Sequence, residues 1–178
     1  LAKDTVISTA GRIKLLELSF SRIAFGPSLM PFVAMPLAWF YSLRHSGGGS
    51  RILLWGLAYG VFALALRRLR AQYEREKPTL APAALLQKWQ TVYKFASMLH
   101  GLGLSTLVLI TAGTAPFEFA LLLYIILAAI TSANAIILSP VLGVYLYLFA
   151  SGWCVATALV MLGLGLLAAQ TPALQPVF

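Results

Sequence analysis

Residues Phe117 to Leu138 read FEFALLLYIILAAITSANAIIL, a long apolar stretch with Glu118 as its single charged side chain. The pattern extends outward from this stretch. After Lys94 no other Asp, Glu, Lys or Arg occurs, and long apolar runs are interrupted only by small, polar or proline residues. Runs of this length match the hydrocarbon core of a bilayer, which an α-helix crosses in about 20 residues. The sequence therefore predicts a polytopic membrane protein.

Composition supports the same class of protein. Of the 178 residues, 60% are hydrophobic and 10% are charged, and the mean hydropathy is +0.87, which is outside the range of soluble domains. A net charge of +8 would suggest nucleic-acid binding if it formed a stripe on a soluble surface. The basic side chains instead flank apolar segments, which is typical of contact with anionic lipid headgroups. We therefore expect membrane lipids, and no nucleic acid, as partners.

The predicted fold is an all-α, polytopic transmembrane helix bundle. A tight turn is expected between the last two spans, near Ser139-Pro140, because proline removes a backbone donor and breaks a helix. The chain begins with Leu1 and not with Met, so we expect a piece of a longer polypeptide in which a sixth span follows. The five spans expected here are Ile23–Leu43, Ile52–Leu66, Phe95–Ala112, Phe117 to about Leu138, and Val141–Ala169.

The distribution of basic residues predicts the orientation. Of the 13 Lys and Arg, all but Arg44 and Arg51 precede the first span or lie between the second and third spans. By the positive-inside rule these two regions face the cytoplasm, so the N-terminus is expected inside a bacterial inner membrane. Trp89 and Tyr93 are expected at the membrane interface, where the third span begins.

Residues 1–22 are predicted to form an amphipathic helix on the cytoplasmic leaflet, and residues 23–178 the transmembrane domain. The apolar residues of the first segment recur at helical spacing, and basic residues occupy its other faces. An ordinary lead-in to the first span is the alternative. The apolar face comprises Val6, Ala10, Ile13, Leu16, Phe20 and Ile23.

Groups suited to catalysis are scarce. The two histidines, His45 and His100, are expected near opposite sides of the membrane, and Asp4 is the single aspartate. No carboxylate pair, nucleophile motif or metal-ligand spacing is found in the sequence. We therefore predict no catalytic residue, no metal site and no cofactor in this segment.

His100 is the leading candidate for a sensing residue, because a titratable group at membrane depth is a functional hypothesis by default. The alternative is a neutral imidazole that hydrogen-bonds to a neighbouring helix. Ser132 and Asn134 belong to a small polar cluster late in the fourth span. They either join helices or form the floor of a ligand cavity.

Aromatic and glycine residues supply the other candidates. Tyr124, Tyr145 and Trp153 either line a pocket for a hydrophobic small-molecule ligand or simply pack. Gly56 and Gly60 form a Gly-x-x-x-Gly pattern in the second span. Such a pattern lets two helices approach closely, either inside the bundle or across a dimer interface.

The order of these features resembles a known family. A basic exit from the second span (Leu66–Arg70) precedes a third span that opens with Trp89 and continues into His100–Gly103. The fourth span then ends in the small-residue stretch Ala128–Asn134, before Ser139-Pro140. This order resembles the N-terminal multi-span sensor modules of bacterial signalling proteins, in which six spans precede a histidine kinase, hybrid kinase or diguanylate cyclase region.

The resemblance implies a dimeric sensory and anchoring module that responds to a hydrophobic or membrane-resident stimulus, such as a fatty-acid or ketone-like autoinducer. In that family Trp-Gly often follows the His-Gly segment, whereas Leu104-Ser105 stands there in this chain. Two other classes remain open: a small transporter or channel, and a non-catalytic membrane assembly subunit.

Overall fold

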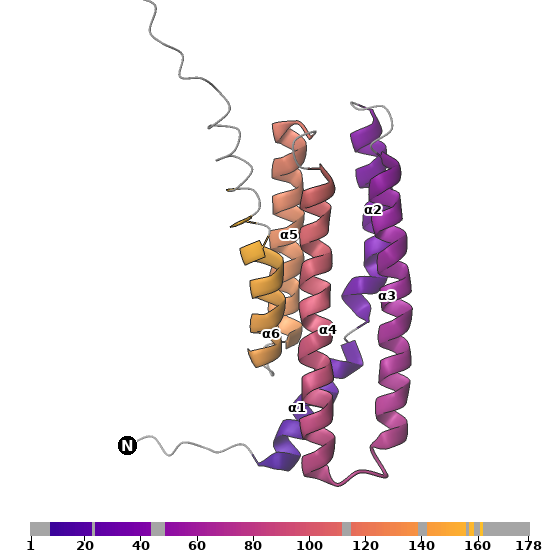
Figure 1. Ribbon diagram of the computed structural model, residues 1–178, viewed down its shortest axis with the longest axis vertical. Coiled ribbons are helices and arrows are strands. Elements are labelled where there is room, and N and C mark those ends of the chain that lie inside the picture. Colours follow the sequence, from indigo (N-terminus) through magenta and orange to yellow (C-terminus); the bar gives the residue numbers. More distant parts are fainter. Residues whose placement is uncertain are drawn as a thin grey trace, which may run out of the picture.

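The computed structural model describes residues 8–22, 24–43, 49–111, 115–138, 142–155, 157–158 and 161, and all its elements are helices that lie side by side (Figure 1). The predicted all-α bundle is therefore confirmed. In chain order the elements are α1 (Thr9–Arg22), α2 (Phe25–Ser42), α3 (Gly49–Glu76), α4 (Pro82–Thr111), α5 (Phe117–Leu138), α6 (Leu142–Phe149) and the π-helix η2 (Ala150–Cys154).

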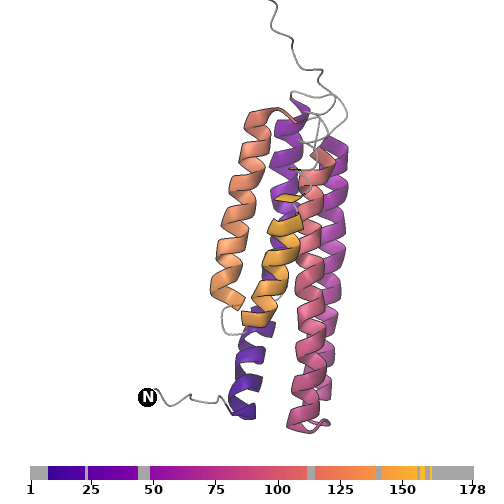
Figure 2. The ribbon, with the colours of Figure 1, turned by 60° about the vertical axis from the view of Figure 1, so that its left-hand side comes forward.

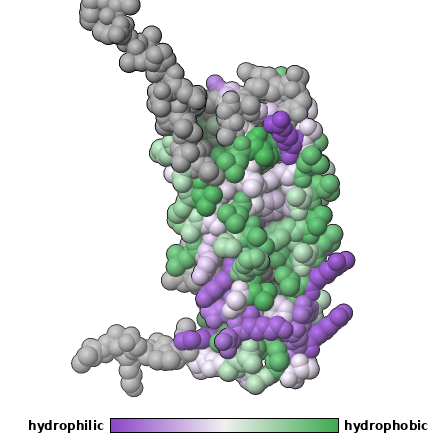
Figure 3. Space-filling view, in the orientation of Figure 1, coloured by the Kyte–Doolittle hydropathy of each residue, from purple (hydrophilic) through white to green (hydrophobic). Residues whose placement is uncertain are grey.

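Three helical segments are long and apolar enough to cross a membrane, and a shorter apolar helix lies within α5. Hydrophilic surface gathers in a band at the end of the bundle where α1 lies, and hydrophobic surface predominates beyond it, with one smaller hydrophilic patch near the opposite end (Figure 3). We call the first of these the basic end. Most of the predicted fifth span after Val155, and everything after Met161, lies outside the described residues. The segments long enough to cross are Thr9–Ser42, Gly49–Glu76 and Pro82–Thr111.

The helices are longer than the apolar runs that predicted them. The second predicted span, Ile52–Leu66, is the middle of α3, and the third, Phe95–Ala112, corresponds to the later part of α4. The 28 residues of α3 extend about 42 Å at 1.5 Å per residue, against a hydrocarbon core of about 30 Å. Both helices therefore continue past the membrane at the basic end. Pro82 starts α4, where its missing N–H has no helical partner to lose.

Within the predicted amphipathic segment 1–22, the structure describes α1, and the apolar side chains late in α1 are turned to the protein; Val6 and Ile23 of the predicted face lie outside the described residues. Leu16 and Phe20 are each 1% exposed and pack on α3 and α4. Trp89 and Tyr93, expected at the lipid interface, lie buried in the same cluster because α1 covers them. The ring of Phe20 has its neighbours at centroid distances of 5.3 to 5.6 Å: Tyr73, Trp89 and Tyr93.

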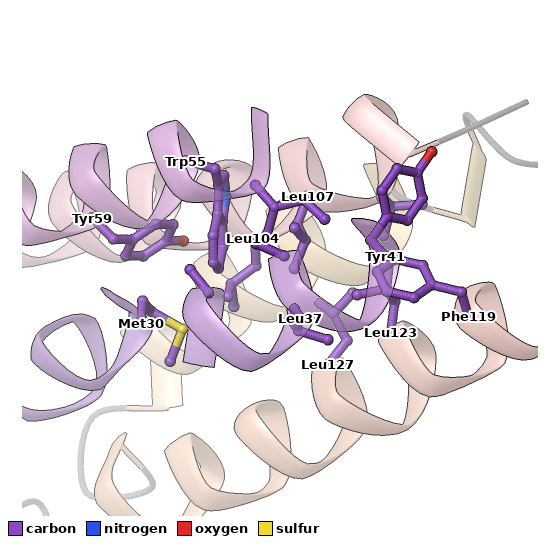
Figure 4. Packing of buried hydrophobic residues seen from close by; sticks show 14 residues of the cluster. Met30, Leu37, Tyr41, Trp55, Tyr59, Leu104, Leu107, Phe119, Leu123 and Leu127 are labelled. Atoms are coloured by element: carbon purple, nitrogen blue, oxygen red, sulfur yellow. The ribbon is translucent and has the colours of Figure 1, made fainter. Parts of the chain in front are cut away.

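The main core joins α2, α3, α4 and α5 (Figure 4). A Cβ added at Gly56 of α3 would overlap Ala34 of α2, so glycine is what lets these two helices approach here. A Cβ added at Gly60 would lie 3.6 Å from Pro31 Cγ, an ordinary contact. Both glycines thus face α2 of the same chain. On the other side of the bundle, α6 lies between α4 and α5 (Figure 2).

Candidate functional site

His100 is a buried imidazole in the middle of α4. Its side chain is surrounded by aromatic rings of α3 and is 6% exposed. The ring centroid lies 5.6 Å from Tyr59 in an edge-on arrangement and 6.3 Å from Phe62 in a stacked one. Neither ring nitrogen has a hydrogen-bond partner among the described residues. A buried polar group without a partner costs stability, so this ring is an unusual feature of the bundle interior.

A glycine on α2 leaves space beside this ring. A Cβ added at Gly26 would lie 3.9 Å from His100 Nε2 and 3.8 Å from Asn134 Oδ1, both ordinary contacts. The Asn134 side chain is 9% exposed, and its Nδ2 donates to the Ile130 carbonyl at 3.0 Å. Polar atoms of α4 and α5 therefore converge on one point of the α2 backbone.

The backbone around His100 is held firmly by α3. The Tyr59 hydroxyl donates to the His100 carbonyl at 2.7 Å, and Trp55 Nε1 donates to the Gly103 carbonyl at 2.8 Å. A Cβ added at Gly103 would lie 2.6 Å from Tyr59 Oη, so no larger residue fits there without a shift. The His100 ring thus lacks partners although its backbone is locked in place.

A neighbouring face of α4 packs tightly on the last described turns. A Cβ added at Gly101 would overlap Ser151 Oγ and lie 2.5 Å from the Leu148 carbonyl oxygen. Ser105 Oγ lies 2.8 and 2.9 Å from the carbonyl oxygens of Ser151 and Gly152. These carbonyls belong to η2, a π-helix, which is wider than an α-helix and whose backbone hydrogen bonds span one residue more. The hydroxyl of Ser105 offers these carbonyls an additional hydrogen-bond partner.

The aromatic candidates form a separate contact between α5 and η2. Trp153 Nε1 donates to Thr131 Oγ1 at 2.8 Å, and its ring centroid lies 6.3 Å from that of Tyr124. Ser132 is exposed on the surface of α5. The side chain of Tyr145 lies outside the described residues.

The structure thus divides the candidates that the sequence singled out. It brings His100 and Asn134 together, and it pairs Tyr124 with Trp153 elsewhere. Gly26 is the part of the site that sequence reasoning missed. A glycine in the first turn of an apolar helix carries no sequence signal of its own. Its place in the site follows from the approach of α4 and α5, which the sequence does not show.

Glu76 fastens α3 to α4 at the basic end, beyond the membrane-spanning part of α3. Its carboxylate accepts hydrogen bonds from Lys88 Nζ at 2.7 and 2.8 Å, from Gln72 Nε2 at 2.9 Å and from Trp89 Nε1 at 3.1 Å. The hydrogen bond from Lys88 is the main reason that the pKa of Glu76 lies below its ordinary value. The two helices therefore leave the bundle as a joined pair.

Two arginines of α3 lie close to the level of the His100 site. Arg67 Nη2 donates to Ser28 Oγ at 3.4 Å, and Arg70 Nη1 donates to the Ser21 carbonyl at 2.9 Å. Ser28 follows Gly26 by two residues, so a guanidinium lies near the same level along the bundle as the space at Gly26. The site is therefore near the boundary between basic and apolar surface.

Within the part of the chain that the structure describes, no three His, Cys, Asp or Glu side chains come together as they would around a metal ion. Comparison with protein-family models, curated proteins and solved structures finds no match for this chain. The geometry of the site is therefore the basis for assigning a function.

Proposed function

We propose that this chain is the membrane-embedded sensory module of a bacterial signalling protein, which detects a hydrophobic or membrane-resident stimulus. The observation that carries the proposal is His100, a buried imidazole whose two nitrogens lack partners among the described residues, next to the space at Gly26. Polar groups at membrane depth are costly and are retained where they serve a function. A ligand that completes these hydrogen bonds would favour one packing of the bundle over another.

Helix α4 provides a route from this site to the basic end. His100 and Trp89 are on the same helix, about 16 Å apart along its axis at 1.5 Å per residue. Trp89 is buried under α1 and donates a hydrogen bond to Glu76, so a change in how the other helices pack on α4 would be transmitted to both α1 and the end of α3. Coupling of this kind requires an element with two arrangements that both sites bias. We propose the packing of α2 and α5 on the His100 side of α4 as that element, with α4 itself held to α3 and η2.

The basic end faces the cytoplasm in this proposal, because basic residues are retained on the inner side of bacterial membranes. The output region is a histidine kinase, with a diguanylate cyclase as the alternative, in the longer polypeptide to which the module belongs. The module acts as a homodimer in the inner membrane, as the resemblance to sensor modules implies.

The test uses the natural polypeptide, purified and reconstituted in liposomes. We expect its intact mass to exceed 19.2 kDa and sequencing past Phe178 to reach a kinase or cyclase domain. Autophosphorylation or cyclic dinucleotide synthesis should change across a panel of amphiphiles, and His100→Leu should abolish that response. An unchanged output across the whole panel would refute the sensory role, and solute flux through the same liposomes would support a transporter instead.

A further inference from the structure

We propose that α1 is a detachable helix, which lies on the α3–α4 hairpin (residues 67–94) in the structure and moves from there to an anionic phospholipid surface. The inference goes beyond the proposed sensory function and does not depend on it, because it concerns the basic end and not the His100 site. It combines three features of the described residues: a small apolar contact, like charge on the two surfaces, and a weak ion pair between them.

The apolar contact of α1 with the hairpin is small and largely aromatic. Leu16 and Phe20 are the large apolar side chains of α1 that are buried, and the ring of Phe20 meets those of Tyr73, Trp89 and Tyr93. Tyrosine and tryptophan rings have an apolar body and a polar tip, and they are common at the headgroup level of membranes. The headgroup region is therefore a suitable alternative cover for this cluster.

The same contact buries two hydroxyl groups. Ser19 on α1 and Tyr93 on α4 are both 0% exposed, and neither hydroxyl has a partner at hydrogen-bond distance among the described residues. A buried hydroxyl without a partner costs stability, whereas water or a lipid headgroup supplies the partner once α1 has moved away. The docked state is thus less stable than its apolar contacts alone would make it.

Electrostatic repulsion also opposes the docked state. Helix α1 has three basic side chains and one acidic side chain, and the hairpin has seven basic and two acidic ones. Glu17, the single acidic residue of α1, forms an ion pair with Lys77 and accepts a hydrogen bond from Tyr73 Oη at 3.4 Å. The ion-paired side chains are 32% and 45% exposed, and ion pairs that water reaches in this way are weak. A weak ion pair thus opposes the repulsion between two basic surfaces.

An anionic leaflet satisfies both the charges and the apolar side chains of α1. Its basic residues Arg12, Lys14 and Arg22 are all exposed in the docked state, and basic side chains are attracted to a surface of negatively charged headgroups. Leu16 and Phe20 become available when α1 leaves the hairpin. A helix that has apolar side chains on one face and basic ones on the others binds in the plane of the membrane interface.

The connection to α2 permits this movement. Helix α1 ends at Arg22 and α2 begins at Phe25, so the two are separate elements. The close approach of Gly56 to Ala34 holds α2 on α3 without help from α1. Arg70 donates to the Ser21 carbonyl at 2.9 Å, in the last turn of α1, and this bond can persist while the rest of α1 moves. Release of α1 therefore leaves the membrane-spanning bundle intact.

The test measures the distance between α1 and α4 by double electron–electron resonance. Spin labels are attached at Ala10→Cys and Ala84→Cys, two exposed positions, after Cys154→Ser removes the exposed cysteine. The chain is incorporated in nanodiscs of phosphatidylcholine alone or mixed with an equal amount of phosphatidylglycerol. We expect one distance in the neutral lipid and a second, longer one in the mixture. Labels at Ala71→Cys and Ala84→Cys, both within the hairpin, are the control and should keep one distance.

Charge variants assign the cause of the movement. Glu17→Gln should raise the ratio of detached to docked α1 about threefold, since it removes one weak ion pair. Arg12→Gln combined with Lys14→Gln should lower this ratio up to about 25-fold, because each basic side chain contributes up to about fivefold at an anionic surface. Glu118→Gln, at an exposed carboxylate of α5, is the matched control for Glu17→Gln and should have no effect. Circular dichroism of each variant verifies its helical content.

The outcomes decide the inference independently of the proposed function. The same single distance in both lipid mixtures would show that α1 is a fixed part of the bundle, and the inference falls. A longer distance that appears equally in neutral lipid, or that persists in the Arg12 and Lys14 double variant, would refute the anionic surface as the partner. A change in the control pair would mean that the hairpin itself opens. Lipid-dependent release of α1 supports the inference whether or not amphiphiles change the output of the natural polypeptide.

Discussion

The two sides of α4 near its middle differ in how completely they are packed. Toward η2, Gly101 leaves no space for a methyl group, and Ser105 is within hydrogen-bond distance of two π-helix carbonyls. Toward α2 and α5, His100 lacks partners among the described residues, and Gly26 leaves space beside it. Gly101 and His100 are adjacent in α4, yet Gly101 belongs to a tightly packed contact and His100 to one in which its ring has no hydrogen-bond partner.

The bundle is therefore expected to be rigid on the η2 side of α4 and able to respond on the His100 side. A contact in which every polar group is paired and no space remains has one good arrangement. A buried group without a partner raises the energy of the ligand-free state, and a ligand that supplies the partner lowers it. The contact with η2 therefore acts as the fixed side against which the His100 side can change.

Gly101→Ala should destabilise the bundle by about 3 kcal/mol, because the new methyl overlaps Ser151 Oγ and crowds the Leu148 carbonyl, and backbone cannot yield cheaply. The measurement is reversible unfolding in mixed micelles followed by circular dichroism. Gly60→Ala is the control and should change the free energy of unfolding by less than about 1 kcal/mol, since its methyl has room. Equal effects of the two variants would show that the contact of α4 with η2 is not closed.

Ser105→Ala should lower the free energy of unfolding by about 1–2 kcal/mol, because it removes the hydroxyl that lies within hydrogen-bond distance of the π-helix carbonyls of Ser151 and Gly152. Thr106→Ala is the matched control, since the neighbouring Thr106 hydroxyl is exposed and donates to the Gly103 carbonyl within its own helix. The same unfolding assay compares the two. A loss in Thr106→Ala as large as that in Ser105→Ala would contradict a special role for Ser105.

His100→Leu, unlike Ser105→Ala, should not lower the free energy of unfolding when no ligand is present. Replacing a buried, unpartnered imidazole by an apolar side chain removes a desolvation cost, so the free energy of unfolding should stay constant or rise by about 1 kcal/mol. The assay is unfolding in delipidated micelles. A loss above about 1 kcal/mol would mean that His100 has a partner in the ligand-free protein, and the contrast between the two sides would then disappear.

The smallest effect concerns pH at the basic end. The lowered pKa of Glu76 means that its contribution to stability is complete above 4.5, the ordinary value, and is lost as the pH falls through the lower value of the folded protein. We expect a shallow loss of stability below that pH, weakened by salt because the ion pair is accessible to water. Glu76→Gln should remove this step, whereas Glu74→Gln should retain it. A step unchanged in Glu76→Gln would assign it to another carboxylate.

Much of the fold was predictable because hydropathy is a local property. The apolar runs predicted α2, α5 and the membrane-crossing parts of α3 and α4. Ser139 and Pro140, where a turn was predicted, lie outside the described residues. Helix ends were predicted less well. Charged residues such as Arg67 end an apolar run, but they are good helix formers. Helices α3 and α4 therefore extend beyond the apolar runs from which they were predicted.

By itself, the sequence determined a basic, all-helical membrane bundle and named His100 and Asn134 as unusual polar groups, because composition and periodicity belong to single segments. Tertiary structure decided what those groups face. It placed Gly26 beside them, directed Gly56 to α2, buried Trp89 under α1 and made η2 a π-helix against Gly101. Such facts depend on distances between helices far apart in the chain, and no local pattern of residues encodes those distances.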